Sequence, residues 1–172
     1  MAITKIQSES LNLSDNYDFT GTVTGAGGVN TPNFYATRTG SDFNLPQNTS
    51  TKVIFNTEVF DTDNCYDTSN GRFTPNVSGK YFVRANLYGT FGGAVPNLWF
   101  FKIYKNGTRV MEEGYSAYGS NPGFVYVKSV SAIVEMNGTT DYVEIYAQVG
   151  VSSAYIGYTN DITNFQAFKI IE

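Results

Sequence analysis

The sequence predicts an all-β protein, and three observations support this fold class. Apolar and polar residues alternate with a period of two in several segments, as side chains do along a half-buried strand. Glycine and asparagine separate these segments at roughly the spacing that turns have in β proteins. No window of about a dozen residues shows the three- and four-residue spacing of apolar positions that an amphipathic helix needs.

Length and charge limit the classes of protein that this chain can belong to. Its 172 residues make one domain with, at most, a short appendage. The formal net charge is −4 and the 11 lysine and arginine residues are not clustered, which argues against nucleic acid as a partner. No apolar run is long enough to cross a bilayer, so we expect no membrane insertion.

The chain lacks the residues of the common hydrolytic sites. It contains no histidine, which removes Ser-His-Asp and Cys-His catalysis and the usual zinc sites. Its one cysteine, Cys65, cannot form an intrachain disulfide. A glycoside hydrolase needs two carboxylates about 5–9.5 Å apart, but the adjacent pair Glu112 and Glu113 would point to opposite faces of a strand. We therefore expect a protein that is not an enzyme and needs no cofactor.

Residues 1–33 differ from the rest and are expected to form an extended N-terminal arm with a glycine-rich neck. The stretch 20–32 is small and polar and cannot build a core. A disordered tail and an arm that orders against a neighbouring protein are both compatible with this composition. The arm is favoured because four large aliphatic residues, which a pure spacer would not need, precede the glycines. These attachment candidates are Ile3, Ile6, Leu11 and Leu13.

Residues 34–172 are expected to form one β head. In the first strand, four residues of equal parity, Val53, Phe55, Thr57 and Val59, are predicted to share a face. The later strands are predicted from the same alternation, at 81–87, 99–104, 129–136, 142–149 and 165–171.

The connections between these strands predict a molecule with two different ends. Asn-Gly at 106–107 and at 137–138 supplies the positive φ that a tight hairpin turn needs. Because sequential strands in a β-sandwich mostly run antiparallel, connections alternate between its ends. The tight turns then share one end, which we call the base. The three long loops share the other end, which we call the crown; they are 89–97, 113–124 and 150–162.

Six spaced residues resemble the signature of a known family. The pattern is Phe55-x5-Asp61-x4-Tyr66-x6-Phe73-x5-Gly79-x-Tyr81. It resembles the complement C1q-type globular head, which is related to the tumour-necrosis-factor jelly roll. The family has aromatic residues where this chain has Val83 and Ala85, although both keep the strand parity. The resemblance implies a jelly-roll β-sandwich and a homotrimer.

The arm resembles the N-terminal segments of some bacteriophage structural proteins. These open with a similar phrase of Leu-Asn-Leu, here at 11–13, and Thr-Gly-Thr-Val-Thr-Gly-Ala-Gly, here at 20–27. The chain begins without the apolar segment of a signal peptide. The resemblance implies a virion protein that assembles in the host cytoplasm, and the arm would bind other virion proteins.

Aromatic residues on strand faces opposite the expected core make a trimer plausible. Each such ring can bury about 150–250 Å², and rings left exposed would make a monomer adhesive. A domain thick enough to bury them itself is the alternative. The candidates for the trimer interface are Phe100, Tyr104, Tyr142, Tyr146 and Phe168.

The crown combines aromatic rings with amides, as saccharide or protein recognition sites do. Aromatic residues in glycine-rich loops can equally serve as anchors for the loops themselves. The candidates for contact with a host-surface glycan or protein are Tyr88, Phe91, Asn97, Tyr115, Tyr118, Asn121, Tyr155 and Tyr158.

One turn is rich in oxygen ligands and is a weak candidate for calcium. It contains Asp61, Asp63 and Asp67, and the alternative is a solvated turn. The sequence leaves three functions open: a trimeric tail-fibre or receptor-binding protein, a capsid-decoration protein of the same fold, and, remotely, a surface-glycan depolymerase.

Overall fold

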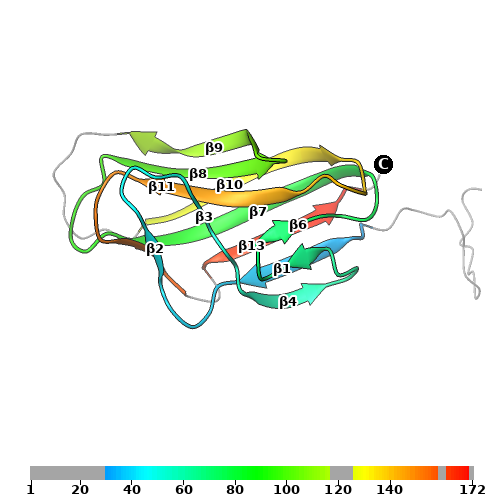
Figure 1. Cartoon of the computed structure of the whole chain (residues 1–172), viewed down its shortest axis with the longest axis horizontal. Helices are drawn as coiled ribbons and strands as arrows, with labels where there is room; N and C mark the ends of the chain where they lie inside the picture. The colour runs from blue at the N-terminus through cyan, green and yellow to red at the C-terminus, as the bar shows by residue number, and fades with distance from the viewer. Residues whose placement is uncertain (1–29, 117–125, 159–161, 171–172) are drawn as a thin grey trace, which may run out of the picture.

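The computed structural model describes residues 30–116, 126–158 and 162–170, which form a β-sandwich (Figure 1). The strands are β1 (Asn33–Thr37), β2 (Phe43–Leu45), β3 (Thr51–Lys52), β4 (Thr57–Asp61), β5 (Tyr66–Asp67), β6 (Arg72–Phe73), β7 (Gly79–Thr90), β8 (Leu98–Lys105), β9 (Thr108–Ser116), β10 (Tyr126–Met136), β11 (Val143–Val149), β12 (Ala154–Ile156) and β13 (Asn164–Lys169). Within the described ranges, no helix is long and apolar enough to cross a membrane.

Two antiparallel sheets make the layers of the sandwich and confirm the predicted jelly roll. The seven-stranded sheet has the order β2-β12-β7-β13-β1-β4, and β10 pairs with β7 at its other edge. The six-stranded sheet has the order β5-β6-β11-β8-β9, and β3 pairs with β11. Strands that are far apart in sequence, such as β1 and β13, are neighbours.

The crown and the base lie at opposite ends of the sandwich, as the connections predict. At the crown, Gly89 pairs with Tyr126 and Leu98 pairs with Ser116. At the base, the ends of β8 and β9 meet in a tight turn (Figure 1). The backbone N–H of Lys169 donates to the carbonyl of Pro32 (3.2 Å). The chain therefore enters β1 and leaves β13 at the base.

A cluster of aromatic side chains fills the base half of the core and joins the two sheets. The ring of Phe34 on β1 stacks on Tyr66 and on Phe73, with both centroids 4.6 Å away. Phe165 on β13 meets Phe34 edge-on at 4.8 Å. The hydroxyl of Tyr66 donates to the carbonyl of Phe55 (2.9 Å). All five are buried, so the aromatic residues of the family pattern are core residues.

The two remaining kinds of residue in the pattern have local backbone roles. The carboxylate of Asp61 accepts hydrogen bonds from the backbone N–H of Tyr66 (2.6 Å) and of Asp63 (3.2 Å), which closes the turn before β5. Gly79 begins β7 with a φ of 143°, and a Cβ there would lie 2.7 Å from Cε of Lys169. A side chain at this position would therefore be strained and would displace the neighbouring strand's lysine.

The predicted strand 53–59 is wrong in one respect, because the chain changes sheets within it. β3 pairs with β11 in the six-stranded sheet, and β4 pairs with β1 in the seven-stranded sheet. The alternation of inward and outward side chains therefore does not continue from β3 into β4. Val53 and Phe55 are buried as predicted, but Val59 is 59 % exposed.

Removal of the central ring should destabilise the whole head. We expect Phe34→Ala to lower the free energy of unfolding by about 3–5 kcal/mol, because it leaves a cavity among the three aromatic rings that contact Phe34. Urea unfolding at a fixed protein concentration measures this change. The matched control Val59→Ala removes an exposed side chain and should change the free energy by less than about 0.5 kcal/mol. Equal effects of the two substitutions would contradict the role given to Phe34.

Candidate functional site

The outward face of the seven-stranded sheet carries an apolar patch near the base. One row across the sheet joins Ile133 on β10, Phe82 on β7 and Phe168 on β13. The rings of Phe82 and Phe168 are 5.4 Å apart. Ile133 is 64 % exposed and Phe168 is 39 % exposed. Contiguous exposed apolar residues are a common feature of surfaces that bind other molecules.

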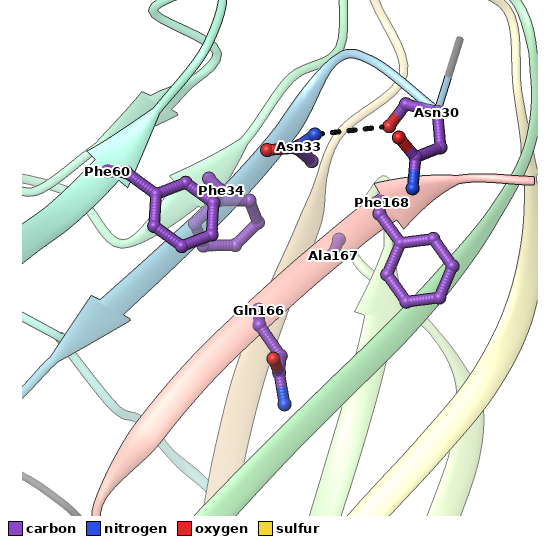
Figure 2. Close-up of a pocket in the computed structure, with 7 residues that line it drawn as sticks. All are labelled: Asn30, Asn33, Phe34, Phe60, Gln166, Ala167 and Phe168. Carbon is purple, nitrogen blue, oxygen red and sulfur yellow. Dashed lines mark hydrogen bonds between the residues drawn. The ribbon is translucent and has the colours of Figure 1, made fainter.

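A hollow of about 230 Å³ opens in the same face, beside the patch. Phe60 on β4 forms one wall and Phe168 on β13 forms the other, as Figure 2 shows. Between them lie Asn33 on β1 and Gln166 on β13, and the side chain of Asn33 donates to the carbonyl of Asn30 (3.3 Å). The hollow thus has aromatic walls and an amide floor.

The outward face of the six-stranded sheet is covered by its own charged side chains. Four of the five predicted interface residues lie here: Phe100, Tyr104, Tyr142 and Tyr146. The guanidinium of Arg72 lies 4.0 Å from the ring centroid of Tyr142, and the rings of Tyr104 and Tyr146 are 4.4 Å apart. Phe168 lies on the opposite outward face of the sandwich, so the five candidates do not form one surface.

Glu144 is the centre of that charged network. Its side chain is only 3 % exposed, and one carboxylate oxygen accepts from Lys52 (3.0 Å) and from Arg72 (2.8 Å). Burial acts to raise the pKa of Glu144, but the hydrogen bonds from Arg72 and Lys52 outweigh it and hold the pKa below its usual value of 4.5. The carboxylate is therefore charged and paired at neutral pH, and it fixes β3 and β6 to β11.

The crown presents some of the predicted contact residues to solvent. Tyr155 on β12 is 37 % exposed and Tyr158 is 50 % exposed. Tyr88 is half-buried, and its ring lies so close to Gly157 that a Cβ there would overlap it. Asn97 is exposed and lies against Gly150 in the same way.

Phe91 is the one crown candidate that the structure contradicts. Its side chain is 3 % exposed and packs edge-on against Trp99 at a centroid distance of 5.0 Å. It anchors the loop between β7 and β8 to the core, because a phenyl ring in this glycine-rich loop gains more from burial than from exposure. Its burial leaves almost none of its surface open to a ligand.

Several predicted residues lie outside what the structure describes. Tyr118 and Asn121 fall within 117–125, and the attachment candidates Ile3, Ile6, Leu11 and Leu13 fall within 1–29. Tyr115 lies in β9, and its backbone pairs with that of Trp99 in β8. All of these remain predictions.

The acidic turn uses its carboxylates to shape its own backbone. Asp61 accepts from two backbone N–H groups, as described above, and Asp67 accepts from the hydroxyl of Ser69 (2.6 Å) and the amide of Asn70 (2.6 Å). No group of three metal-ligating side chains comes together among the residues that the structure describes. The carboxylates of Asp61 and Asp67 each accept from the backbone N–H two residues on, which is the hydrogen bond of an Asx turn.

Sequence reasoning missed Phe60, Phe82 and Ile133 as surface residues. Phe82 and Ile133 have the opposite parity to the buried residues of their strands. The alternation in the sequence already placed both residues on the outward face of their strands. An aromatic or aliphatic residue at such an outward position was the signal that could have found them. Phe60 could not be found in this way, because the sheet change before β4 resets the parity.

The buried carboxylate makes stability depend on pH. Glu144→Gln should lower the free energy of unfolding by about 1–3 kcal/mol at pH 7, because two charge-assisted hydrogen bonds are weakened. Since the folded pKa is depressed, the contribution of Glu144 is present above pH 4.5 and is lost as the pH falls through the folded pKa. Urea unfolding of both proteins across this range should show their difference shrinking; a constant difference would contradict the pairing.

The chain is similar in sequence to a protein of a phage-like element. The chain is 29 % identical over 119 residues to the phage-like element PBSX protein XkdV of Bacillus subtilis (strain 168). This match covers 66 % of the chain but spans only 16 % of the relative's length.

Solved structures of two related kinds share the fold. The globular domain of zebrafish complement 1qA protein matches with a TM-score of 0.60 at 18 % identity, covering 81 % of this chain and 98 % of that one. Murine APRIL at pH 8.0 matches with a TM-score of 0.59 at 10 % identity, covering 80 % and 98 %. The C1q domain model matches residues 33–167. The chain belongs to the C1q domain family.

Proposed function

We propose that this chain is a non-enzymatic, trimeric structural protein of a phage or phage-like particle, whose head binds the host surface through the crown. The observation that carries the proposal is that the head has two different ends. The chain enters and leaves at the base, while exposed tyrosines lie at the crown. A head attached at the base would present its crown away from the particle.

The similarity to a phage-like element protein supports the particle as the location. Residues 1–29 precede the base, where the described chain begins at Asn30. They are suited to join the head to other virion proteins, in a tail fibre or spike. Domains of the C1q and tumour-necrosis-factor type are generally binding domains, and this supports recognition over catalysis.

The seven-stranded sheet supports assembly better than the six-stranded sheet. Its outward face leaves Ile133, Phe60 and Phe168 uncovered, whereas cations lie against the rings of the other face. C1q- and tumour-necrosis-factor-like folds commonly form homotrimers. We therefore assign the trimer contacts to the face that contains Phe168.

The oligomeric state tests the assembly part of the proposal. Sedimentation of the purified chain at micromolar concentration should show a trimer, because exposed apolar area of this kind is buried by association. A monomer at that concentration would contradict it.

Removal of the exposed crown rings should weaken adhesion without unfolding the head. We expect particles that carry Tyr155→Ala with Tyr158→Ala to adsorb to host cells at least several-fold more weakly, because aromatic residues dominate binding surfaces. Thermal unfolding of the variant should stay close to that of the unsubstituted protein. The control Val77→Ala changes an exposed side chain (43 %) outside the crown loops and should leave adsorption unchanged. Unchanged adsorption of the crown variant would count against recognition by these tyrosines.

A further inference from the structure

We propose that the crown binds a neutral saccharide, with one sugar ring stacked on Tyr155 and its hydroxyls bonded by Asn44 and Thr90. The inference rests on the proposed recognition by the crown and names the chemical class of the ligand. The three residues form one row across the outward face of the seven-stranded sheet. Tyr155 on β12 pairs with Asn44 on β2 and with Thr90 on β7.

The side chains of this row point away from the core and lie close together. Tyr155 is exposed between two buried residues of β12, and Asn44 is exposed on β2. Thr90 follows the buried Gly89 at the end of β7. Side chains directly opposite each other on paired strands have Cβ atoms about 4.5–5.5 Å apart. The ring of Tyr155 therefore has an amide on one side and a hydroxyl on the other.

The polar atoms of the row are available to a ligand. Among the residues that the structure describes, the amide of Asn44 and the hydroxyls of Thr90 and Tyr155 make no hydrogen bond. An amide and two hydroxyls offer both donors and acceptors, as the hydroxyls of a sugar require. An exposed ring between such groups is the combination of apolar surface and few placed polar groups that small-ligand sites use.

The charges around the row favour a neutral ligand over an acidic one. No residue of the row is charged, and Asp42, two residues before Asn44, is exposed. A carboxylate accepts from sugar hydroxyls but repels an anion. The cation that interacts with Asp42 is Arg38. Its guanidinium donates to the carbonyl of Ile54 (2.9 Å) and lies 4.9 Å from the ring centroid of Phe43. An acidic ligand therefore finds no cation in the row itself.

The surface beside Tyr155 is already formed before a ligand arrives. Its strand, β12, is paired on both sides, with β2 and with β7. In the next row, the ring of Tyr88 lies against Gly157, where a Cβ would be 2.2 Å from Cδ1 of that ring. The carbonyl of Gly157 accepts from the hydroxyl of Thr163 (2.7 Å), and its N–H donates to the carbonyl of Tyr88 (2.8 Å). Two tyrosine rings are thus held in neighbouring rows, so that little order has to be gained on binding.

The row is separate from the apolar patch near the base, although both lie on the same sheet. Thr90 and Phe82 are on the same strand, β7, and eight residues of strand span roughly 26 Å. Contacts at the row of Phe82 therefore leave the row of Thr90 open. Assembly and saccharide binding can be tested independently.

Chemical treatment of host cells distinguishes a saccharide from a protein ligand. Periodate cleaves the vicinal diols of sugars, whereas a protease cleaves surface proteins. We expect periodate to lower adsorption of the particles at least several-fold and the protease to leave it unchanged. The reverse result would overturn the inference, and recognition by the crown would stand if Tyr155→Ala with Tyr158→Ala still lowers adsorption. Adsorption that this crown variant leaves unchanged would overturn both.

Substitutions in the row test the residues themselves, with the purified chain and an array of immobilised neutral and acidic oligosaccharides. We expect binding to neutral oligosaccharides that is lost in Tyr155→Ala and at least threefold weaker in Asn44→Ala and in Thr90→Val, since each removes one contact group. The matched controls Asn76→Ala and Thr108→Val remove the same groups from exposed positions at the base and should bind like the unsubstituted chain. Thermal unfolding checks that all five variants are folded. Binding only to acidic oligosaccharides, or equal binding by the row and control variants, would overturn the inference.

Discussion

The stack of aromatic rings around Phe34 is the interaction on which the head depends. Phe34 and Phe165 come from the seven-stranded sheet, and Tyr66 and Phe73 come from β5 and β6 of the six-stranded sheet. The short strands β5 and β6 contain two residues each, so their own hydrogen bonds hold them weakly. The rings fix them to the sandwich. The positions of the base, the entry to β1 and the hollow beside it all follow from this packing.

The two outward faces of the sandwich differ in what covers their aromatic rings. Both carry pairs of neighbouring aromatic rings. On the six-stranded sheet, Arg72 lies over the ring of Tyr142 and Lys102 lies over that of Phe100. Both cations are also held by hydrogen bonds, to a carboxylate and to an amide oxygen respectively. On the seven-stranded sheet, the row of Ile133, Phe82 and Phe168 contains no cation, and Ile133 and Phe168 remain open to solvent. The two faces therefore differ in how their apolar side chains are covered.

Local pattern in the sequence was sufficient for much of the fold. The shared face of Val53 and Phe55, the strand that begins near Tyr81, and the separation of long loops from tight turns followed from period-two alternation and from Asn-Gly pairs. Features that depend on distant pairing were not accessible. Val59 is exposed because the chain changes sheets before it, and Phe91 is buried because Trp99 lies opposite its loop. The hollow joins three strands from both ends of the chain.

The hydrogen bond between Lys169 and Pro32 holds the start of β1 beside the end of β13. A fold whose first and last strands meet in this way can be inserted at one position in a longer chain. Both junctions of such a head with a longer chain would therefore lie at the base. The crown loops lie at the opposite end of the sandwich and take no part in them.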